Sequence, residues 1–93
     1  MAIYALYIRF TDNEERRLAT RPVHREYLKT LHEAGKMIEG GPFTDDTGAI
    51  IVYEVESKEA AEAQFAQDPY SITGGIVESV TFHEWNRVFA PKV

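Results

Sequence analysis

A histidine on an otherwise apolar helix face is the residue of this sequence best suited to chemistry. His24, Leu28 and Leu31 fall at positions i, i+4 and i+7, which places them on one face of a predicted α-helix. Because such a face packs toward a sheet rather than into water, the imidazole is half sheltered and needs a hydrogen-bond partner. Imidazole exchanges protons near neutral pH, which makes His24 a candidate general acid or base. The alternative interpretation is a core histidine bonded to a backbone carbonyl.

The predicted partner of this histidine is Asp68, which precedes Pro69 at the end of a second predicted helix. Ala61, Phe65 and Asp68 fall at i, i+4 and i+7, so helical phase points the carboxylate inward, where it needs a donor or a cation. A carboxylate beside an imidazole fixes its tautomer and raises its basicity, and the two form an acid/base pair. Asp68 is equally explained as a helix stop, since proline disfavours helix in the residue before it.

Two arginines and an acidic loop supply candidates for substrate binding. Arg17 and Arg21 lie near the start of the helix that carries His24, and either can hold a carboxylate through paired hydrogen bonds. A solvated helix face is the simpler explanation of both. Asp46, next to Asp45 in a predicted hairpin loop, is a candidate pocket carboxylate and an alternative partner for His24. Aspartates in such loops are commonly plain turn residues.

Tyr70 and Ser71 follow Asp68 directly and can donate hydrogen bonds to an oxyanion that develops during a reaction. A nucleophilic role for Ser71 would need a base within reach, and no spacing in the sequence provides one. We therefore place both among the candidate substrate-binding residues.

Metal and cofactor sites are not expected. The three histidines, His24, His32 and His83, include no pair with His-x-x-x-His spacing, and His32 lies about 80° further round the helix than His24. The glycine pairs at 40–41 and 74–75 lack the order of strand, glycine-rich loop and helix that binds nucleotide phosphates. Cysteine is absent from the 93 residues, which excludes disulfides, thiolate metal sites, iron–sulfur clusters and thiol nucleophiles.

The composition fits one globular domain over residues 1–93, with an apolar content of 44%. Ten Lys and Arg residues against 15 Asp and Glu residues give a net charge of −5, which disfavours nucleic acid as a partner. The sequence has no apolar run long enough to span a bilayer and no leader-like start. We therefore expect no membrane partner and a cytoplasmic location.

The periodicity of apolar residues predicts alternating strands and helices. Residues 2–10 and 49–55 have buried-strand patterns. A short helical turn is expected over 14–18, and the main helix then opens with Pro22 in its first turn and ends at Gly35. The remaining predicted elements are a short strand at 36–39, a turn or bulge at 40–42, a hairpin loop at 44–48, a helix at 58–67 capped by Ser57, and a long strand at 76–89.

The resulting order, β-α-β-β-α-β, predicts an α+β ferredoxin-like sandwich in which two helices cover one face of an antiparallel sheet. Alternation in the last strand puts Thr81, His83 and Trp85 opposite the face of Val80 and Phe82, which leaves apolar surface on the helix-free side. A homodimer packed sheet to sheet would cover that surface, and higher oligomers remain open.

Three short motifs, in order along the chain, carry a resemblance to a known family. They are Arg21-Pro22-x-His24-x-x-Tyr27-Leu28, then Gly41-Pro42 with Asp45-Asp46 and Gly48, then Asp68-Pro69-Tyr70 with a downstream glycine. Together they resemble the YCII-related (YciI-like) domain over nearly the whole chain. This family is similar to muconolactone isomerase and other dimeric α/β-barrel proteins, so the resemblance implies that the predicted sandwich forms a dimeric α/β barrel.

The resemblance also implies a small pocket with a His–Asp pair, in which His24 is the family histidine and Asp68 is the aspartate of its Asp-Pro-Tyr/Phe motif. Most members have no established substrate, and one branch is linked to dehydrochlorination of chlorinated hydroxyquinols. The chain departs from the family in two places. The stretch between residues 42 and 48 is short, which bears on the lid of the pocket, and residues 71–75 replace a more usual alanine-rich segment at its floor.

The sequence thus predicts a cofactor-free enzyme that acts on a small anionic molecule, aromatic or lactone-like. In it His24 moves a proton while Asp68 orients the imidazole and balances its charge. Isomerase chemistry and lyase chemistry, dehydrohalogenation included, both remain open. The alternatives are a non-catalytic dimeric module that binds a small ligand or a protein through the same cleft, and a purely structural dimer.

Overall fold

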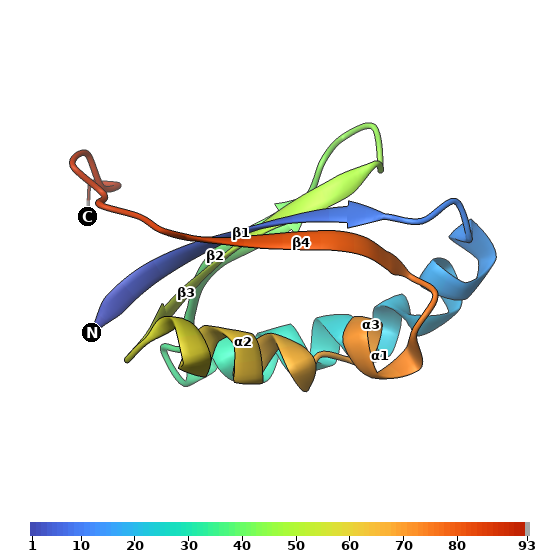
Figure 1. Ribbon diagram of the computed structural model, residues 1–93, viewed down its shortest axis with the longest axis horizontal. Coiled ribbons are helices and arrows are strands. Elements are labelled where there is room, and N and C mark those ends of the chain that lie inside the picture. The colour runs from blue at the N-terminus through green and yellow to red at the C-terminus, as the bar shows by residue number, and fades with distance from the viewer. Residues whose placement is uncertain (93) are drawn as a thin grey trace.

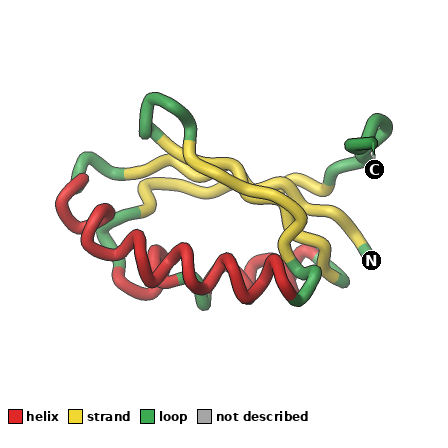
Figure 2. The backbone as a smooth tube through the Cα atoms, turned by 180° about the vertical axis from the view of Figure 1, so that it is seen from behind, coloured by secondary structure: helices red, strands yellow, loops and turns green. Residues whose placement is uncertain are grey.

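A computed structural model describes residues 1–92 as one antiparallel sheet with all helices on one of its faces (Figure 1). The elements are β1 (Ala2–Phe10), α1 (Glu14–Glu33), β2 (Met37–Pro42), β3 (Gly48–Val55), α2 (Lys58–Ala66), α3 (Pro69–Thr73) and β4 (Val77–Glu84). The strand order is β2-β3-β1-β4, with every neighbouring pair antiparallel. This confirms the ferredoxin-like β-α-β-β-α-β sandwich, with the short helix α3 as an addition. Seen from behind in Figure 2, the helices again form a separate layer on one side of the strands.

Helix α1 is one continuous helix, so the prediction of a short turn followed by a separate helix is wrong. Asn13 caps its first turn, and Pro22 lies inside it. Proline removes one hydrogen bond from a helix and crowds the preceding turn. Both halves of α1 nevertheless bury a side chain, Arg17 before the proline and Leu31 after it, so packing offsets the lost bond. The predicted end is confirmed, because Gly35 follows the helix with a φ of 77°.

Two strand boundaries also differ from the prediction. Strand β2 continues to Pro42 instead of turning at residues 40–42, and its irregularity lies between Met37 and Glu39. Pro42 is tolerated because β2 is an edge strand, where a missing N–H need not face a neighbour. Strand β4 ends at Glu84 rather than at residue 89. Its partner β1 begins at Ala2, so only Ile3 and Ala2 lie beyond the pairing of Tyr4 with Glu84. The carbonyl of Ile3 accepts from the backbone N–H of Trp85 at 2.8 Å, and β1 is too short to pair with residues as far as 89.

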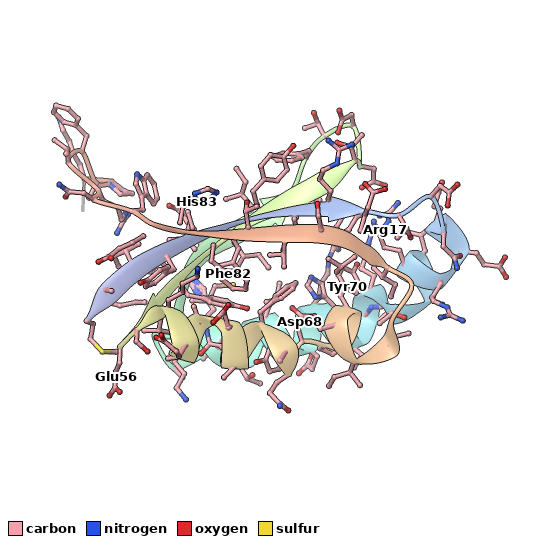
Figure 3. All side chains as sticks on the ribbon, in the orientation of Figure 1. Arg17, Glu56, Asp68, Tyr70, Phe82 and His83 are labelled. Carbon is pink, nitrogen blue, oxygen red and sulfur yellow. The ribbon has the colours of Figure 1, made fainter. Side chains whose placement is uncertain are left out.

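The core lies between the helices and the inner face of the sheet. Its buried members are Tyr4, Leu6, Ile8, Leu31, Met37, Ile51, Tyr53, Val55, Ala61 and Phe65. The alternation predicted for the last strand is confirmed, since Phe82 pairs with the buried Leu6 while Thr81 pairs with the exposed Tyr7. In Figure 3, Phe82 points toward the helices and His83 points away from them. The helix-free face therefore carries exposed apolar side chains, as expected.

Among residues 1–92, no helix has the length and apolarity needed to cross a membrane.

Candidate functional site

His24 and Asp68 meet between α1 and α3, although 44 residues separate them in the sequence. The Nδ1 atom of His24 lies 2.7 Å from Oδ1 of Asp68. The Asp68 side chain is fully buried, whereas 12% of the His24 side chain is exposed. With the carboxylate accepting at Nδ1, the neutral imidazole carries its proton there and keeps its lone pair on Nε2. The arrangement is therefore one in which Nε2 can take up a proton and the buried carboxylate can balance the charge.

Asp68 reaches this position for a different reason from the one that the sequence indicated. Helix α2 ends at Ala66, so Asp68 lies outside it, in an extended conformation that caps α3. Its Oδ1 atom accepts a second hydrogen bond, from the backbone N–H of Tyr70 at 2.9 Å. Pro69 occupies the first position of α3, where its missing N–H does no harm. The inward direction is thus set by capping and not by the helical phase of α2.

The ring of Tyr70 fixes the orientation of the His24 imidazole. The two rings stack with centroids 3.7 Å apart and an angle of 2° between the planes. The edge of Phe10 in turn packs against Tyr70, with ring centroids 5.7 Å apart. Tyr70 thus contacts the predicted acid/base pair through its ring and its backbone. The sequence predicted a different role for Tyr70, that of a hydroxyl donor to a substrate.

The surroundings of Asp68 are polar and buried. Among residues 1–92, no hydrogen-bond partner is found for its Oδ2 atom, for the Tyr53 hydroxyl or for Ser71 Oγ, and all three atoms are buried. Burial raises the pKa of Tyr53, and the negative charge of Asp68 raises it further. The pKa of Tyr27 is raised for the same two reasons, and its hydroxyl donates to the Gln64 carbonyl at 2.6 Å. Sequence reasoning missed Tyr53, although its inward position in the strand pattern was a usable signal.

A cleft of about 480 Å³ lies in front of His24, between α1 and strand β2. It is bounded by side chains from both halves of the sequence, among them Phe10, Arg17, Arg21, His24, Leu28 and Tyr70. Of the predicted site residues, Arg17, Arg21, His24 and Tyr70 therefore share one cavity, while Asp68 lies behind the imidazole. Ser71 does not line the cleft.

Asp46 pairs with the two arginines and not with His24. Its Oδ2 atom lies 3.3 Å from Nη2 of Arg17, and its Oδ1 atom lies 3.6 Å from Nη2 of Arg21. Arg17 is 4% exposed, so the interpretation as a solvated helix residue is wrong for it. Its guanidinium stands over the ring of Phe10, 4.9 Å from the centroid. The sequence left two partners open for His24, and its hydrogen bond goes to Asp68.

The neighbouring Asp45 shapes the hairpin loop. Its Oδ1 atom accepts from the backbone N–H and the hydroxyl of Thr47, at 3.1 and 2.7 Å. These hydrogen bonds, the one from the side chain above all, lower the pKa of Asp45. The predicted turn chemistry of residues 44–48 is therefore confirmed for this aspartate.

Of the remaining histidines, His32 also lines the cleft and His83 does not. The residues that the structure describes contain no group of three or more His, Cys, Asp or Glu side chains able to hold a metal ion. His83 lies on the helix-free face, where its Nε2 atom is 3.0 Å from the hydroxyl of Thr81.

Known proteins resemble this chain along nearly its whole length. The model of the YCII-related domain matches residues 2–86. The protein YciI of Escherichia coli is 34% identical over 98 aligned positions, which cover 94% of this chain and 99% of that protein. An uncharacterised protein of Haemophilus influenzae is 32% identical over 85 positions, covering 81% and 86%. Among solved structures, 5-chloro-2-hydroxyhydroquinone dehydrochlorinase (TftG) from Burkholderia phenoliruptrix superposes with a TM-score of 0.77 at 23% identity, over 90% of this chain and 93% of that one. The resemblance read from the three motifs is confirmed, and the chain belongs to the YCII-related domain family.

Proposed function

We propose that this protein is a small-molecule enzyme in which His24 transfers a proton and Asp68 orients the imidazole. The observation that carries the proposal is the 2.7 Å hydrogen bond from His24 to the fully buried Asp68, at the wall of a cleft. A buried carboxylate stabilises the imidazolium that forms when Nε2 accepts a proton. The stacked ring of Tyr70 limits rotation of the imidazole, so that Nε2 stays directed into the cleft.

The chemistry that fits this arrangement is elimination or isomerisation. Nε2 takes a proton from an acidic C–H or O–H group of the substrate, and the electron pair left behind forms a new double bond. In an elimination a leaving group such as chloride then departs with its electrons. In an isomerisation the imidazolium returns the proton to another carbon. These steps use side chains alone, and we propose that no cofactor takes part.

The size of the cleft supports a substrate with a single ring. Its volume of about 480 Å³ lies in the range of small-ligand sites, and apolar residues line much of it. The solved dehydrochlorinase with the same fold is in complex with 2,5-dihydroxybenzoquinone, a single-ring molecule that ionises readily. A hydroxylated quinone or quinol of this size is accordingly the first substrate class to test.

The test is turnover by matched histidine variants. Purified protein is offered 5-chloro-2-hydroxyhydroquinone and a panel of small enolisable and halogenated acids, with chloride release and absorbance as readouts. His24→Gln should lower turnover by about 10²-fold or more, because an amide cannot accept the proton. His83→Gln, on the opposite face of the sheet, should leave turnover unchanged. If His24→Gln keeps full turnover, His24 does not transfer the proton. If a compound binds the cleft and none is turned over, the protein is a ligand-binding module instead.

We further propose that a second copy of the chain covers the helix-free face of the sheet. Tyr7, Ile50 and Trp85 are each between 41% and 45% exposed there, and Phe43 packs edge-on against Tyr7. Apolar surface of this kind marks an interface, and a two-fold homodimer is the commonest way to bury it. Sedimentation velocity should show a dimer that Ile50→Glu converts to monomer. Val23→Glu, at an apolar residue exposed on α1, should remain dimeric.

A further inference from the structure

The ion pair with Asp46 does not by itself explain why Arg17 is buried. The residue is 4% exposed, and its guanidinium packs over the ring of Phe10. Only Nη2 has a hydrogen-bond partner, whereas Nε and Nη1 are buried with none among residues 1–92. A buried cation is costly unless its N–H groups are paired. Because Arg17 also lines the cleft, an acceptor that enters the cleft is the partner that its geometry suits.

Asp46 is a weak and partial partner for this guanidinium. The Asp46 carboxylate contacts both arginines, with one oxygen 3.3 Å from Nη2 of Arg17 and the other 3.6 Å from Nη2 of Arg21, so neither arginine forms a bidentate pair with it. The side chain of Asp46 is 46% exposed, so water competes for both contacts. The residue stands in the hairpin loop with a φ of 66°, a conformation that aspartate and asparagine tolerate better than most residues.

The charge of the cleft is opposite to that of the whole chain. Its lining includes four permanent cations, at positions 17, 21, 25 and 29, against a single carboxylate, that of Glu33. The chain as a whole has a net charge of −5. A cationic cleft in an acidic protein attracts small anions and raises their local concentration.

The two arginines are also in register with the imidazole. Arg17, Arg21 and His24 fall at i, i+4 and i+7 of α1, which places all three on one face of the helix. Three residues separate Arg21 from His24, which is a rise of about 4.5 Å along the axis. A molecule of one ring can therefore have an anionic group at the arginines and a reacting atom near Nε2.

We propose that Arg17 and Arg21 form an anion-binding subsite at the edge of the cleft. Asp46, which lines the neighbouring hollow and not the cleft itself, pairs with both arginines until a planar oxyanion of the ligand, a carboxylate or an enolate, displaces it. The inference rests on the proposed function for the view that the cleft holds a substrate. It adds the class of the substrate and an internal competitor for its anionic group. Displacement lets the ligand take both edges of the Arg17 guanidinium, and Asp46 moves into water together with its loop.

The test compares two ligands that differ only in charge, on variants of the hairpin loop. Benzoate and benzamide are titrated into the protein and followed through the NMR signals of the arginine Nε–H groups. Asp46→Asn keeps the backbone conformation but removes the competing charge. It should tighten benzoate binding by about fivefold, the factor expected when a competitor occupies the site about four-fifths of the time. Benzamide binding should not change, and neither should benzoate binding by Asp45→Asn, the matched carboxylate one residue away.

The arginine variant gives the opposite result. Arg21→Lys keeps a positive charge but loses the planar fork, and should weaken benzoate binding by about tenfold. The subsite proposal is overturned if Asp46→Asn and Asp45→Asn bind benzoate equally, or if benzamide binds wild type as tightly as benzoate. These readouts do not depend on turnover. If His24→Gln loses turnover and Asp46→Asn has no effect on benzoate binding, the subsite alone is refuted. If His24→Gln keeps turnover and Asp46→Asn tightens benzoate binding, the proposed function alone is refuted.

Discussion

Replacement of Asp68 tests the structure most directly, because one atom of this residue supports two elements. Oδ1 accepts from His24 Nδ1 at 2.7 Å and from the Tyr70 backbone N–H at 2.9 Å, and the side chain is fully buried. Asp68→Ala leaves two sheltered donors without an acceptor, each at about 1–3 kcal/mol, so we expect a loss of about 3–5 kcal/mol. A domain of 93 residues has a total stability of only about 5–14 kcal/mol. Asp68→Ala should therefore lose at least about a fifth of the total stability, and most of it if the wild type lies at the low end of this range.

Asp68→Asn should be much milder. The amide oxygen can stand where Oδ1 stands and keep both hydrogen bonds, while the charge is lost. Hydrogen bonds to charged groups exceed neutral ones by about 1 kcal/mol each, and removal of a buried charge recovers part of this, so we expect a loss of about 1–2 kcal/mol. With a slope near 1 kcal/mol per molar urea, the midpoint should fall by about 1–2 M for asparagine and by about 3 M or more for alanine.

The assay is urea denaturation followed by circular dichroism, with Asp12→Asn as the control. Asp12 is exposed, so its replacement should stay within about 0.5 kcal/mol of wild type. Equal losses for Asp68→Asn and Asp68→Ala would refute the reasoning, since the retained acceptor would then have no value. So would a loss below about 1 kcal/mol for alanine, which is less than an ordinary helix cap contributes.

Three other substitutions test separate parts of the fold by the same denaturation assay. Because the pKa of Tyr53 is raised, the folded state keeps a proton that the unfolded state loses above about pH 10. The free energy of unfolding should therefore fall as the pH rises above about 10, by up to about 1.4 kcal/mol per pH unit, and Tyr53→Phe should abolish this contribution to the slope. A side chain at Gly48 would collide with the carbonyl of Ile8, so Gly48→Ala should destabilise by about 2 kcal/mol or more, whereas Gly41→Ala meets nothing and should lack this penalty. Pro22 is exposed inside α1, and Pro22→Ala should stabilise by about 1 kcal/mol or more because it restores a backbone donor; a lower midpoint would contradict this account of the helix.

Local patterns in the sequence were sufficient for most of the fold. Alternating and continuous apolar runs predicted β1 and β3 to within a residue, because their burial on the sheet is encoded in the residues themselves. The predicted element boundaries were wrong where a tertiary contact outweighed a local sequence preference. Pro22 was read as a helix start, yet Arg17 and Leu31 anchor α1 on both sides of it. Residues 85–89 were predicted to continue the last strand, but β1 begins at Ala2 and is too short to pair with them beyond the hydrogen bond from Trp85 to Ile3.

Most of the residues that meet at the candidate site were named from the sequence, and their geometry was less predictable. His24 and Asp68 were identified from type and spacing, and their hydrogen bond joins positions that no local pattern connects. The burial of Arg17 and its pairing with Asp46 depend on how the hairpin loop lies against α1, which spacing along the chain does not specify. Helical phase gave the right direction for Asp68 through the wrong helix, because the residue caps α3 instead of ending α2.

The double use of Asp68 links the predicted chemistry to the folding of α3. This helix has five residues, which is too short to be stable by itself, so it depends on tertiary contacts. Its cap, Asp68, receives one of those contacts from His24, and Tyr70, the second residue of the helix, stacks on the same imidazole. Helix α3 therefore holds the imidazole of His24 in place only while α3 is folded, and His24 in its place stabilises the folded helix. A substitution that loosens either partner should release both, so the orientation of Nε2 is a property of the α1–α3 contact and not of His24 alone.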